Sequence, residues 1–206
     1  MKVLVACEFS GTVRDAFLAR GHDALSCDLL PSEAPGPHYQ GDVFDVIGRG
    51  WDMMIAHPPC TYLANSGAKH LYRDMKKANG RCPDRWARMR EGAEFFRRLL
   101  AAPIQRKAIE NPIMHGHAAR IIGVRPSQII QPWQFGHREM KATCLHLEGL
   151  PPLVPTNIVG PVPLNPEARK RWAKVHRMPP GPDRWKKRSL TYSGIADAMA
   201  SQWGLS

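Results

Sequence analysis

The chain has 206 residues, of which 43% are apolar and 23% charged, and its formal net charge is +11. This size and composition predict one globular domain, with or without a small appendage. No apolar run approaches the ~20 residues of a membrane-spanning helix, and the N-terminal run before Glu8 is too short for a signal peptide. The five cysteines form no CxxC pair, so we expect no disulfide framework and no metal site, in a reducing, cytoplasmic setting.

The positive charge is concentrated in two segments. Residues 69–98 carry ten Lys/Arg and four acidic residues, and residues 167–188 carry nine and two. The rest of the chain has a net charge of −2. Clustered cations bind a nucleic-acid backbone by releasing its counterions, so both segments are candidates for phosphate contact. The alternative is a solvated helix face and an ordinary basic tail.

The first residues have the pattern of a nucleotide-binding βαβ unit. A buried strand, a helix and a second strand are predicted over residues 2–6, 12–20 and 24–27. Asp28 closes the second strand, where an acid can accept hydrogen bonds from both hydroxyls of a ribose. The turn that contains Ser10-Gly11 is a weak signal, because it is not a Gly-x-Gly-x-x-Gly sequence.

The next predicted strand leads to a cysteine. Residues 31–41, with three prolines, predict a loop before Asp42, which either caps a helix over 43–47 or accepts from the exocyclic amine of an adenine. Residues 53–56 predict a buried strand. It stops at His57-Pro58-Pro59, because consecutive prolines remove backbone donors and fix φ.

Cys60 follows that strand at its carboxyl end, where ligands and chemistry collect in an open α/β sheet. A thiol on a stiff Pro-Pro corner is a candidate nucleophile. A small apolar side chain buried in a rigid turn is the alternative. His57 either lowers the pKa of the thiol or is a polar group at a strand end.

The remaining elements complete an α/β domain. Residues 63–83 predict a long basic connection, which in a compact domain is a lid or a disordered loop. The later elements are a helix, a strand, a short helix, an antiparallel strand pair, a Pro-rich stretch and a final helix, over residues 85–100, 107–110, 117–122, 127–131 with 141–147, 149–166 and 193–203. The predicted fold is therefore one doubly wound, mostly parallel Rossmann-like sheet with an antiparallel edge hairpin.

Cys60 and Glu110 are both expected at the ends of neighbouring strands. Cysteine is the most nucleophilic ordinary side chain, and a carboxyl group can donate to or accept from a heteroaromatic ring. Covalent attack on a pyrimidine needs both groups. The thiolate adds at carbon 6 only if the ring nitrogen is protonated or strongly hydrogen-bonded, and carbon 5 then becomes nucleophilic.

In these motifs and in their order, the chain resembles the DNA cytosine-5 methyltransferases over nearly its whole length. The similar motifs are their Phe-x-Gly cofactor turn, their Pro-Pro-Cys nucleophile loop and their Glu-Asn-Val loop, at Phe9-Ser10-Gly11, Pro58-Pro59-Cys60 and Glu110-Asn111-Pro112. Residues 136–141 stand where the family has a Gln-x-Arg-x-Arg element. Residues 193–199 resemble its final helix, which contacts the cofactor.

The resemblance implies S-adenosylmethionine as methyl donor and a flipped cytosine in DNA as substrate. It implies Cys60 as nucleophile, Glu110 as the group at the ring's nitrogen edge, and Arg138 as a catalytic residue that binds the base or holds the catalytic loop. The cofactor contacts it implies are Phe9, Ser10, Gly11, Asp28, Asp42, Pro59 and Ser193. The expected substrate contacts are Asn111, Lys141, Lys69, Arg73 and Trp185.

The chain departs from that family before its last helix, where a sizeable target-recognition region is usual. The interval here is short, Pro-rich and then basic, so strict sequence specificity is not expected, although its tryptophans can stack on bases. We therefore expect a catalytic core over residues 1–148, a reduced recognition region over 149–190 and a helix over 191–206 that packs back on the core. This compactness suggests a phage or bacterial protein.

Three alternatives remain open. The same chemistry can act on RNA or on a free pyrimidine nucleotide, and a non-catalytic module can bind nucleic acid on a methyltransferase scaffold. Amino-group methyltransferases use an Asp/Asn/Ser-Pro-Pro-aromatic loop, which His57-Pro58-Pro59-Cys60 does not match. The sequence does not indicate an oligomeric state.

Overall fold

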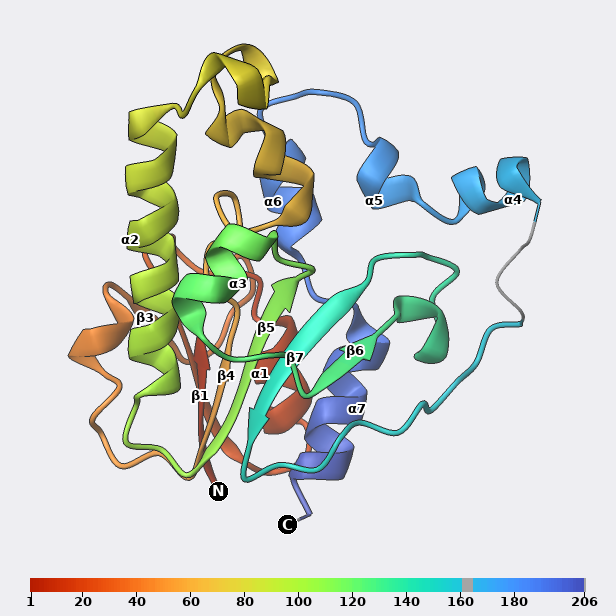
Figure 1. The fold of residues 1–206 in the computed structure, drawn as a ribbon. Coiled ribbons are helices and arrows are strands. Elements are labelled where there is room, and N and C mark those ends of the chain that lie inside the picture. Colours follow the sequence, from red (N-terminus) through yellow and green to blue (C-terminus); the bar gives the residue numbers. More distant parts are fainter. Residues whose placement is uncertain (161–164, 206) are drawn as a thin grey trace.

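The computed structural model describes residues 1–160 and 165–205. In this part of the chain seven strands form one sheet in the order β3-β2-β1-β4-β5-β7-β6, and β7 runs antiparallel to the others (Figure 1). The predicted fold class, a doubly wound, mostly parallel, Rossmann-like sheet with an antiparallel pair at one edge, is confirmed. Residues 161–164 of the predicted Pro-rich stretch and residue 206 lie outside the described residues.

Most predicted elements are present within a few residues. The strands are β1 (Lys2–Ala6), β2 (Asp23–Asp28), β3 (His38–Gln40), β4 (Met53–Ala56), β5 (Arg106–Pro112), β6 (Gln128–Ile130) and β7 (Thr143–Glu148). The α-helices are α1 (Thr12–Leu18), α2 (Pro83–Leu100), α3 (Gly116–Ile122), α4 (Pro166–Arg171), α5 (Lys174–Arg177), α6 (Arg184–Ser189) and α7 (Ser193–Trp203). The short 3₁₀ helices are η1 (Val43–Asp45), η2 (Asn65–Leu71), η3 (Arg73–Met75), η4 (Lys77–Asn79) and η5 (Pro132–Gln134).

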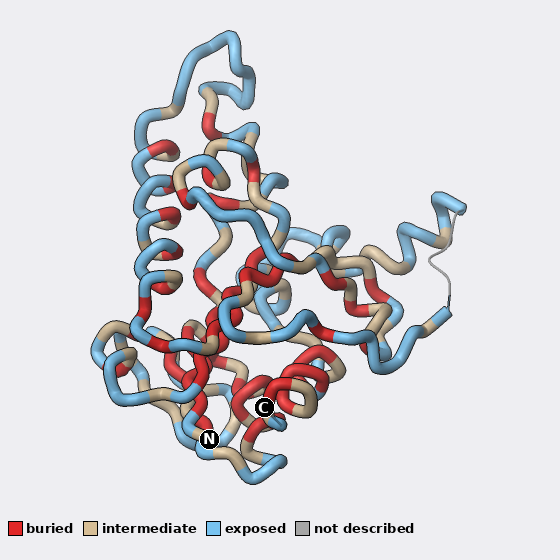
Figure 2. Tube along the Cα trace, turned by 60° about the horizontal axis from the view of Figure 1, so that its bottom comes forward, coloured by how far each residue is buried: buried red, intermediate tan, exposed pale blue. Residues whose placement is uncertain are grey.

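Helices cover both faces of the sheet. Successive strand residues point to opposite faces, so Val3 and Val5 belong to the apolar cluster under α1 and α7, whereas Leu4 and Ala6 belong to the cluster under α2 and α3. Figure 2 shows that burial follows the strands, α7 and the side of α2 that faces the sheet. Among the described helices, none is both long and apolar enough to span a membrane.

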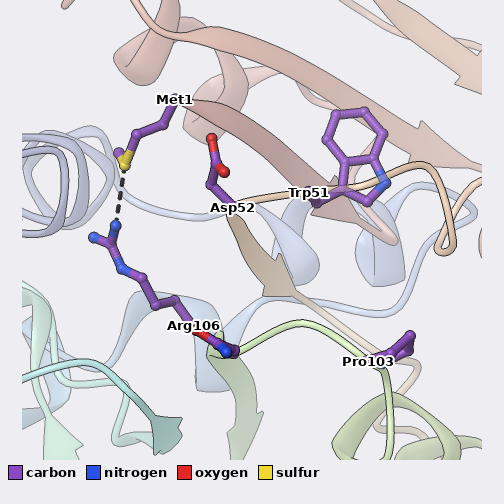
Figure 3. Close-up of a pocket in the computed structure, with 6 residues that line it drawn as sticks. Met1, Trp51, Asp52, Pro103 and Arg106 are labelled. Carbon is purple, nitrogen blue, oxygen red and sulfur yellow. Dashed lines mark hydrogen bonds between the residues drawn. The ribbon is translucent and has the colours of Figure 1, made fainter.

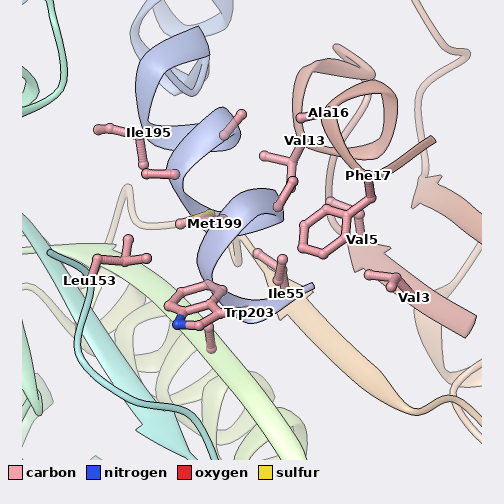
Figure 4. Packing of buried hydrophobic residues seen from close by; sticks show 14 of the residues in the cluster. Val3, Val5, Val13, Ala16, Phe17, Ile55, Leu153, Ile195, Met199 and Trp203 are labelled. Carbon is pink, nitrogen blue, oxygen red and sulfur yellow. The ribbon is translucent and has the colours of Figure 1, made fainter. Parts of the chain in front are cut away.

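Helix α7 closes the fold by packing against α1. Figure 4 shows its side chains meeting those of α1 and of the central strands. Trp203 is fully buried, and its Nε1 donates to Pro151 O at 2.9 Å. Burying a side chain of this size contributes about 2–3 kcal/mol, which explains why the C-terminal helix returns to the first strand. Its residues Ile195, Met199 and Trp203 belong to the same buried apolar cluster as side chains of α1 and β1.

Two segments predicted as loops contain regular structure. Residues 31–41 contain the edge strand β3, which pairs with only three residues of β2 and is too short to give a sequence pattern. Residues 63–83 fold into η2, η3 and η4, which rules out the disordered loop, and the alternative of a lid stays a prediction. Leu71 is buried there, and Trp86 Nε1 donates to its carbonyl at 3.0 Å. This segment (yellow in Figure 1) lies beyond the carboxyl ends of the strands.

Strand β5 also differs from its prediction. It was expected to end at Glu110, but it continues through Asn111 and Pro112 because β7 pairs with both residues. The register joins Asn111 to Cys144 and Pro112 to Thr143. The continued pleat decides which way each side chain of the Glu-Asn-Pro motif points.

Candidate active site

Strands β4 and β5 bring His57 and Glu110 together. The two strands are parallel neighbours, and Ala56 of β4 pairs with Ile109 of β5. The residues that follow these two, His57 and Glu110, therefore also lie side by side. His57 Nδ1 is 3.4 Å from Glu110 Oε2, and the two side chains are 8% and 18% exposed. The backbone N–H of His57 donates to the carbonyl of Ala6 at 2.9 Å, which fixes the chain after β4 against β1.

Cys60 lies close enough to Glu110 to feel its charge. Burial raises the pKa of the Cys60 thiol, and the Glu110 carboxylate raises it further, while Lys141 and Arg188 act in the opposite direction. The net shift is upward, so the thiol holds its proton at neutral pH. A nucleophilic role therefore requires a group that removes this proton during the reaction.

Glu110 is ionised in the resting protein. Burial alone would raise the pKa of its carboxyl group, but the hydrogen bond from His57 and the charges of Lys141 and His57 lower it overall. Lys141 Nζ also donates to the carbonyls of Arg188 at 2.9 Å and Leu190 at 3.4 Å. The ammonium group thus fastens the chain after α6 beside the Cys60–Glu110 site.

Asn111 is not on the same face as Glu110. Because side chains alternate along a strand, Glu110 shares the α1–α7 face with Ala108, whereas Asn111 shares the α2–α3 face with Ile109. Asn111 is fully buried, and neither polar atom of its side chain hydrogen-bonds to a described residue. Direct contact with a base would require the end of β5 to move, and its role in substrate binding stays a prediction.

The predicted arginine and lysine contacts lie at the surface. Arg138 is exposed, and in the described part of the chain its side chain has no hydrogen bond or ion pair. Lys69 on η2 and Arg73 on η3 are also exposed. The structure therefore does not join these three side chains to Cys60, whereas Lys141 does lie at the site.

Trp185 lies elsewhere than a substrate contact was expected. Its ring centroid is 6.2 Å from that of Phe9, in the predicted cofactor turn. Lys186 Nζ lies 5.4 Å from the Phe9 ring centroid and also pairs with Glu33. Helix α6 therefore covers the cofactor turn, and Trp185 is 58% exposed beside it.

The turn after β1 is organised by Glu8, a residue that the sequence did not single out as part of the site. Glu8 is buried, and its carboxylate accepts from the backbone N–H of Val13 at 2.7 Å and of Arg14 at 3.2 Å, which caps α1. Ser10 Oγ donates to Glu8 Oε1 at 3.2 Å. Gly11 has φ +75°, and a Cβ there would lie 2.4 Å from Arg14 Nη2. The sequence signal that could have revealed this role is the position of Glu8, an acidic residue directly after the apolar run of β1.

Arg14 holds the loop after β2. It is fully buried, and its Nε donates to Asp15 Oδ1 at 2.8 Å. Its Nη atoms donate to the hydroxyl group of Ser26 on β2 and to hydroxyl and carbonyl oxygens of the loop that follows, those of Ser32, Ala34, Pro35 and Pro37. This network fixes the loop beside Asp28.

The side chains around Asp28 fit the nucleoside part of a cofactor. Asp28 is half-buried at the end of β2 and uses Oδ1 to accept from Leu30 N at 3.0 Å. No described residue hydrogen-bonds to its Oδ2, which can face a ribose diol. Asp42 caps η1 through Phe44 N at 3.0 Å, as the structural alternative predicted, and its carboxylate remains exposed.

The other predicted cofactor residues frame the same edge of the sheet. Pro59 is exposed after β4, and Ser193 begins α7, where its Oγ lies 3.5 Å from His137 Nε2. Glu8 already occupies amide donors at the start of α1, so an anionic end of a cofactor would need other partners. The residues at this edge of the sheet thus fit the nucleoside part of a cofactor better than they fit a cofactor carboxylate.

The opposite edge of the sheet has a hollow that carries structural contacts (Figure 3). Arg106 donates to Met1 Sδ at 3.1 Å and to Trp203 O at 2.6 Å, and Asp52 accepts from Lys2 N at 2.7 Å. These groups tie the amino ends of the strands together. In the part of the chain that the structure describes, no cluster of His, Cys, Asp or Glu is arranged to hold a metal ion.

No protein-family model and no curated protein matches the chain. Among solved structures it is similar to a "putative DNA modification methyltransferase encoded within prophage" of E. coli, with a TM-score of 0.43 and 14% identity. The alignment covers 70% of this chain and 45% of that protein, so the chain spans less than half of its length. At this level of similarity, function has to be argued from the residues of the site.

Proposed function

We propose that the protein transfers a methyl group from S-adenosylmethionine to carbon 5 of cytosine in DNA, through a covalent bond between Cys60 Sγ and carbon 6. The observation that carries this proposal is that the Cys60 thiol, which follows β4, lies within reach of the charge of Glu110 on the neighbouring parallel strand β5. A thiol beside a carboxyl group is the pair that addition to a pyrimidine requires.

The two side chains have distinct tasks in this mechanism. Cys60 gives up its proton and forms the S–C6 bond, while Glu110 engages the ring nitrogen that gains charge. Carbon 5 then attacks the methyl group, which the sulfonium of bound S-adenosylmethionine supplies. Loss of the carbon 5 proton and cleavage of the S–C6 bond restore the aromatic ring and the cysteine.

The cofactor would lie over the ends of β1 and β2. In this proposal Asp28 holds the ribose, and the aromatic pair of Phe9 and Trp185 offers apolar surface to a nucleoside or to a cationic sulfonium. Asp42 has an exposed carboxylate for an adenine amine. This arrangement supports S-adenosylmethionine as the methyl donor, because it offers a contact for the ribose, the adenine and the sulfonium.

DNA as the substrate is supported by the two basic segments. Residues 69–98 and 167–188 both reach beyond the carboxyl ends of the strands, where the candidate site lies (Figure 1). In the first segment, Arg81 lies 4.2 Å from the Trp86 ring centroid and Arg85 lies 4.5 Å from that of Tyr62. A guanidinium group that stacks on an aromatic ring can still donate hydrogen bonds from its N–H groups to phosphate oxygens.

The decisive experiment is a covalent trap on duplex DNA that contains 5-fluorocytosine. With S-adenosylmethionine present, we expect a stable protein–DNA adduct, because the fluorine cannot leave as a proton does. Cys60→Ser should form none, whereas Cys144→Ser, which replaces a buried thiol on β7, should still form it. Absence of an adduct with the unmodified protein would contradict the mechanism.

The same assay separates the open alternatives. A free-nucleotide enzyme would methylate deoxycytidine monophosphate at rates that do not depend on salt, whereas a polymer substrate gives a steep salt dependence. An RNA enzyme would be trapped on RNA in preference to DNA. Salt-sensitive DNA binding without any adduct would indicate the non-catalytic module.

A further inference from the structure

Glu110 has one hydrogen-bond partner among the described residues, and that partner is His57. The contact is made through Nδ1, at 3.4 Å from Oε2. Because a carboxylate only accepts, the proton of this contact lies on Nδ1. The other carboxylate oxygen, Oε1, makes no hydrogen bond within residues 1–160 and 165–205, so it is the oxygen available to a substrate ring.

His57 is held in a way that suits this contact. Its backbone N–H is bonded to Ala6 O, and Pro58 follows at once, so the residue has little freedom. Its side chain is 8% exposed. Its Nε2 is buried and has no hydrogen-bond partner in the described part of the chain, an arrangement that costs free energy and is not expected of a residue kept for stability.

The charged and titratable groups around Glu110 come from three elements. The chain after β4 contributes His57 and Cys60, the chain before β7 contributes Lys141, and β7 itself contributes Cys144. Arg188 of α6 acts on Cys60. Of these groups, only His57 hydrogen-bonds to the carboxylate, whereas Lys141 spends its donors on the carbonyls after α6.

We propose that His57 is a positioning residue for the methyl transfer proposed above: it orients Glu110 through Nδ1 and shares with it the proton that the ring nitrogen receives. When Cys60 adds, the S–H bond breaks and the S–C6 bond forms. The electron pair of the ring double bond moves toward the ring nitrogen, and the proton on His57 Nδ1 reaches that nitrogen through the Glu110 carboxylate. The thiol proton replaces it on the His57–Glu110 pair, so the pair ends the step with the proton it began with.

The first test does not depend on activity. In free protein with isotope-labelled glutamate, the carboxyl carbon of Glu110 reports the pH at which this group titrates. His57→Leu removes the hydrogen bond and the charge that lower the pKa of Glu110, so its titration should move to higher pH. His57→Asn, whose amide nitrogen can replace Nδ1, should shift it less.

A matched control is His22→Asn, at the amino edge of the sheet, which should leave the titration of Glu110 unchanged. If His57→Leu does not fold, His57→Asn still tests the proposal, because it removes the imidazole charge that lowers the pKa of Glu110 and should still move the titration to higher pH. An unchanged titration of Glu110 in every His57 variant that folds would overturn the proposal, whether or not the protein methylates DNA.

The second test asks whether His57 acts through Glu110. Rates of adduct formation on 5-fluorocytosine DNA should fall about 10-fold in His57→Asn and about 100-fold in His57→Leu. In a Glu110→Gln background, the same His57 substitutions should have no further effect. An equal loss in both backgrounds would show that His57 acts independently and would overturn the proposal. If the unmodified protein forms no adduct, the proposed function fails, and the titration alone decides the pairing.

Discussion

The ends of β1 and β2 and the ends of β4 and β5 lie at one edge of the same sheet, but they treat buried polar groups in opposite ways. Beyond β1 and β2, Arg14 is fully buried and its guanidinium nitrogens are bonded to side-chain and backbone oxygens. Where β4 and β5 end, His57 Nε2 and both polar atoms of the Asn111 side chain have no partner among the described residues.

This difference indicates that the first region serves the stability of the fold and the second serves function. A satisfied buried network fixes a loop, whereas each unsatisfied buried group costs about 1–3 kcal/mol. Such costs persist where a protein needs the groups for something other than folding. We therefore expect substitutions beyond β4 and β5 to change activity more than stability, and substitutions beyond β1 and β2 to do the reverse.

The largest expected effect is on activity, from Cys60→Ser. Loss of the nucleophile should lower turnover by at least about 1,000-fold, while the free energy of unfolding changes by less than about 0.5 kcal/mol. Methyl transfer from labelled cofactor and urea denaturation measure the two quantities. Retained activity would sink the covalent mechanism, and a large loss of stability would remove the contrast between the two regions.

Arg14→Met should give the largest loss of stability, about 3–5 kcal/mol, because it leaves buried carbonyl and hydroxyl oxygens without donors. Arg20→Met is the matched control after the same helix. Arg20 is partly exposed and lies 3.6 Å from Asp197, so its loss should cost no more than about 1 kcal/mol. Equal losses in chemical denaturation would mean that the Arg14 network does not stabilise the loop.

Asn111→Leu is expected to have a smaller effect of the opposite sign. Leucine has the same branching and no polar atoms, so the free energy of unfolding should stay the same or rise by about 1 kcal/mol. The same variant should lower turnover if the predicted substrate role is correct. A loss of stability above about 1 kcal/mol would show that Asn111 serves the fold and would weaken the comparison.

Asn111 also shows what the sequence could and could not predict. The strand, the Pro-Pro-Cys corner and the Glu-Asn-Pro motif were all readable, because they depend on local composition. The direction of the Asn111 side chain depends on pairing with Cys144 of β7, which is remote in sequence. The position of Trp185 against Phe9 depends on how α6 packs, and neither partner carries a local signal for it.

The same reason explains the buried Glu8 and Arg14. As single residues they look like surface charges, and only the fold reveals that one caps α1 and the other holds the loop after β2. The fold class and most of the strands and helices were predictable, because apolar runs and Gly/Pro breaks repeat along the chain. Long-range polar contacts have no such repetition, so they became visible only in the structure.

The smallest expected effect is on the pH dependence of stability, from Glu110. Its pKa in the folded protein lies below the ordinary value of 4.5, mainly because the hydrogen bond and charge of His57 and the charge of Lys141 outweigh burial. The unfolded chain therefore binds the proton first as pH falls. The stabilisation is fully present above that ordinary value and is lost as pH falls through the folded-state pKa.

Comparison of the unmodified protein with Glu110→Gln measures this contribution. Between about pH 6 and pH 3 the unmodified protein should lose more stability than the variant, since only it carries the ionised carboxylate. His57→Asn should reduce the pH dependence, because it removes one of the charges that favour ionisation. A steeper loss in Glu110→Gln would reverse the sign and would mean that burial, and not His57, governs this carboxyl group.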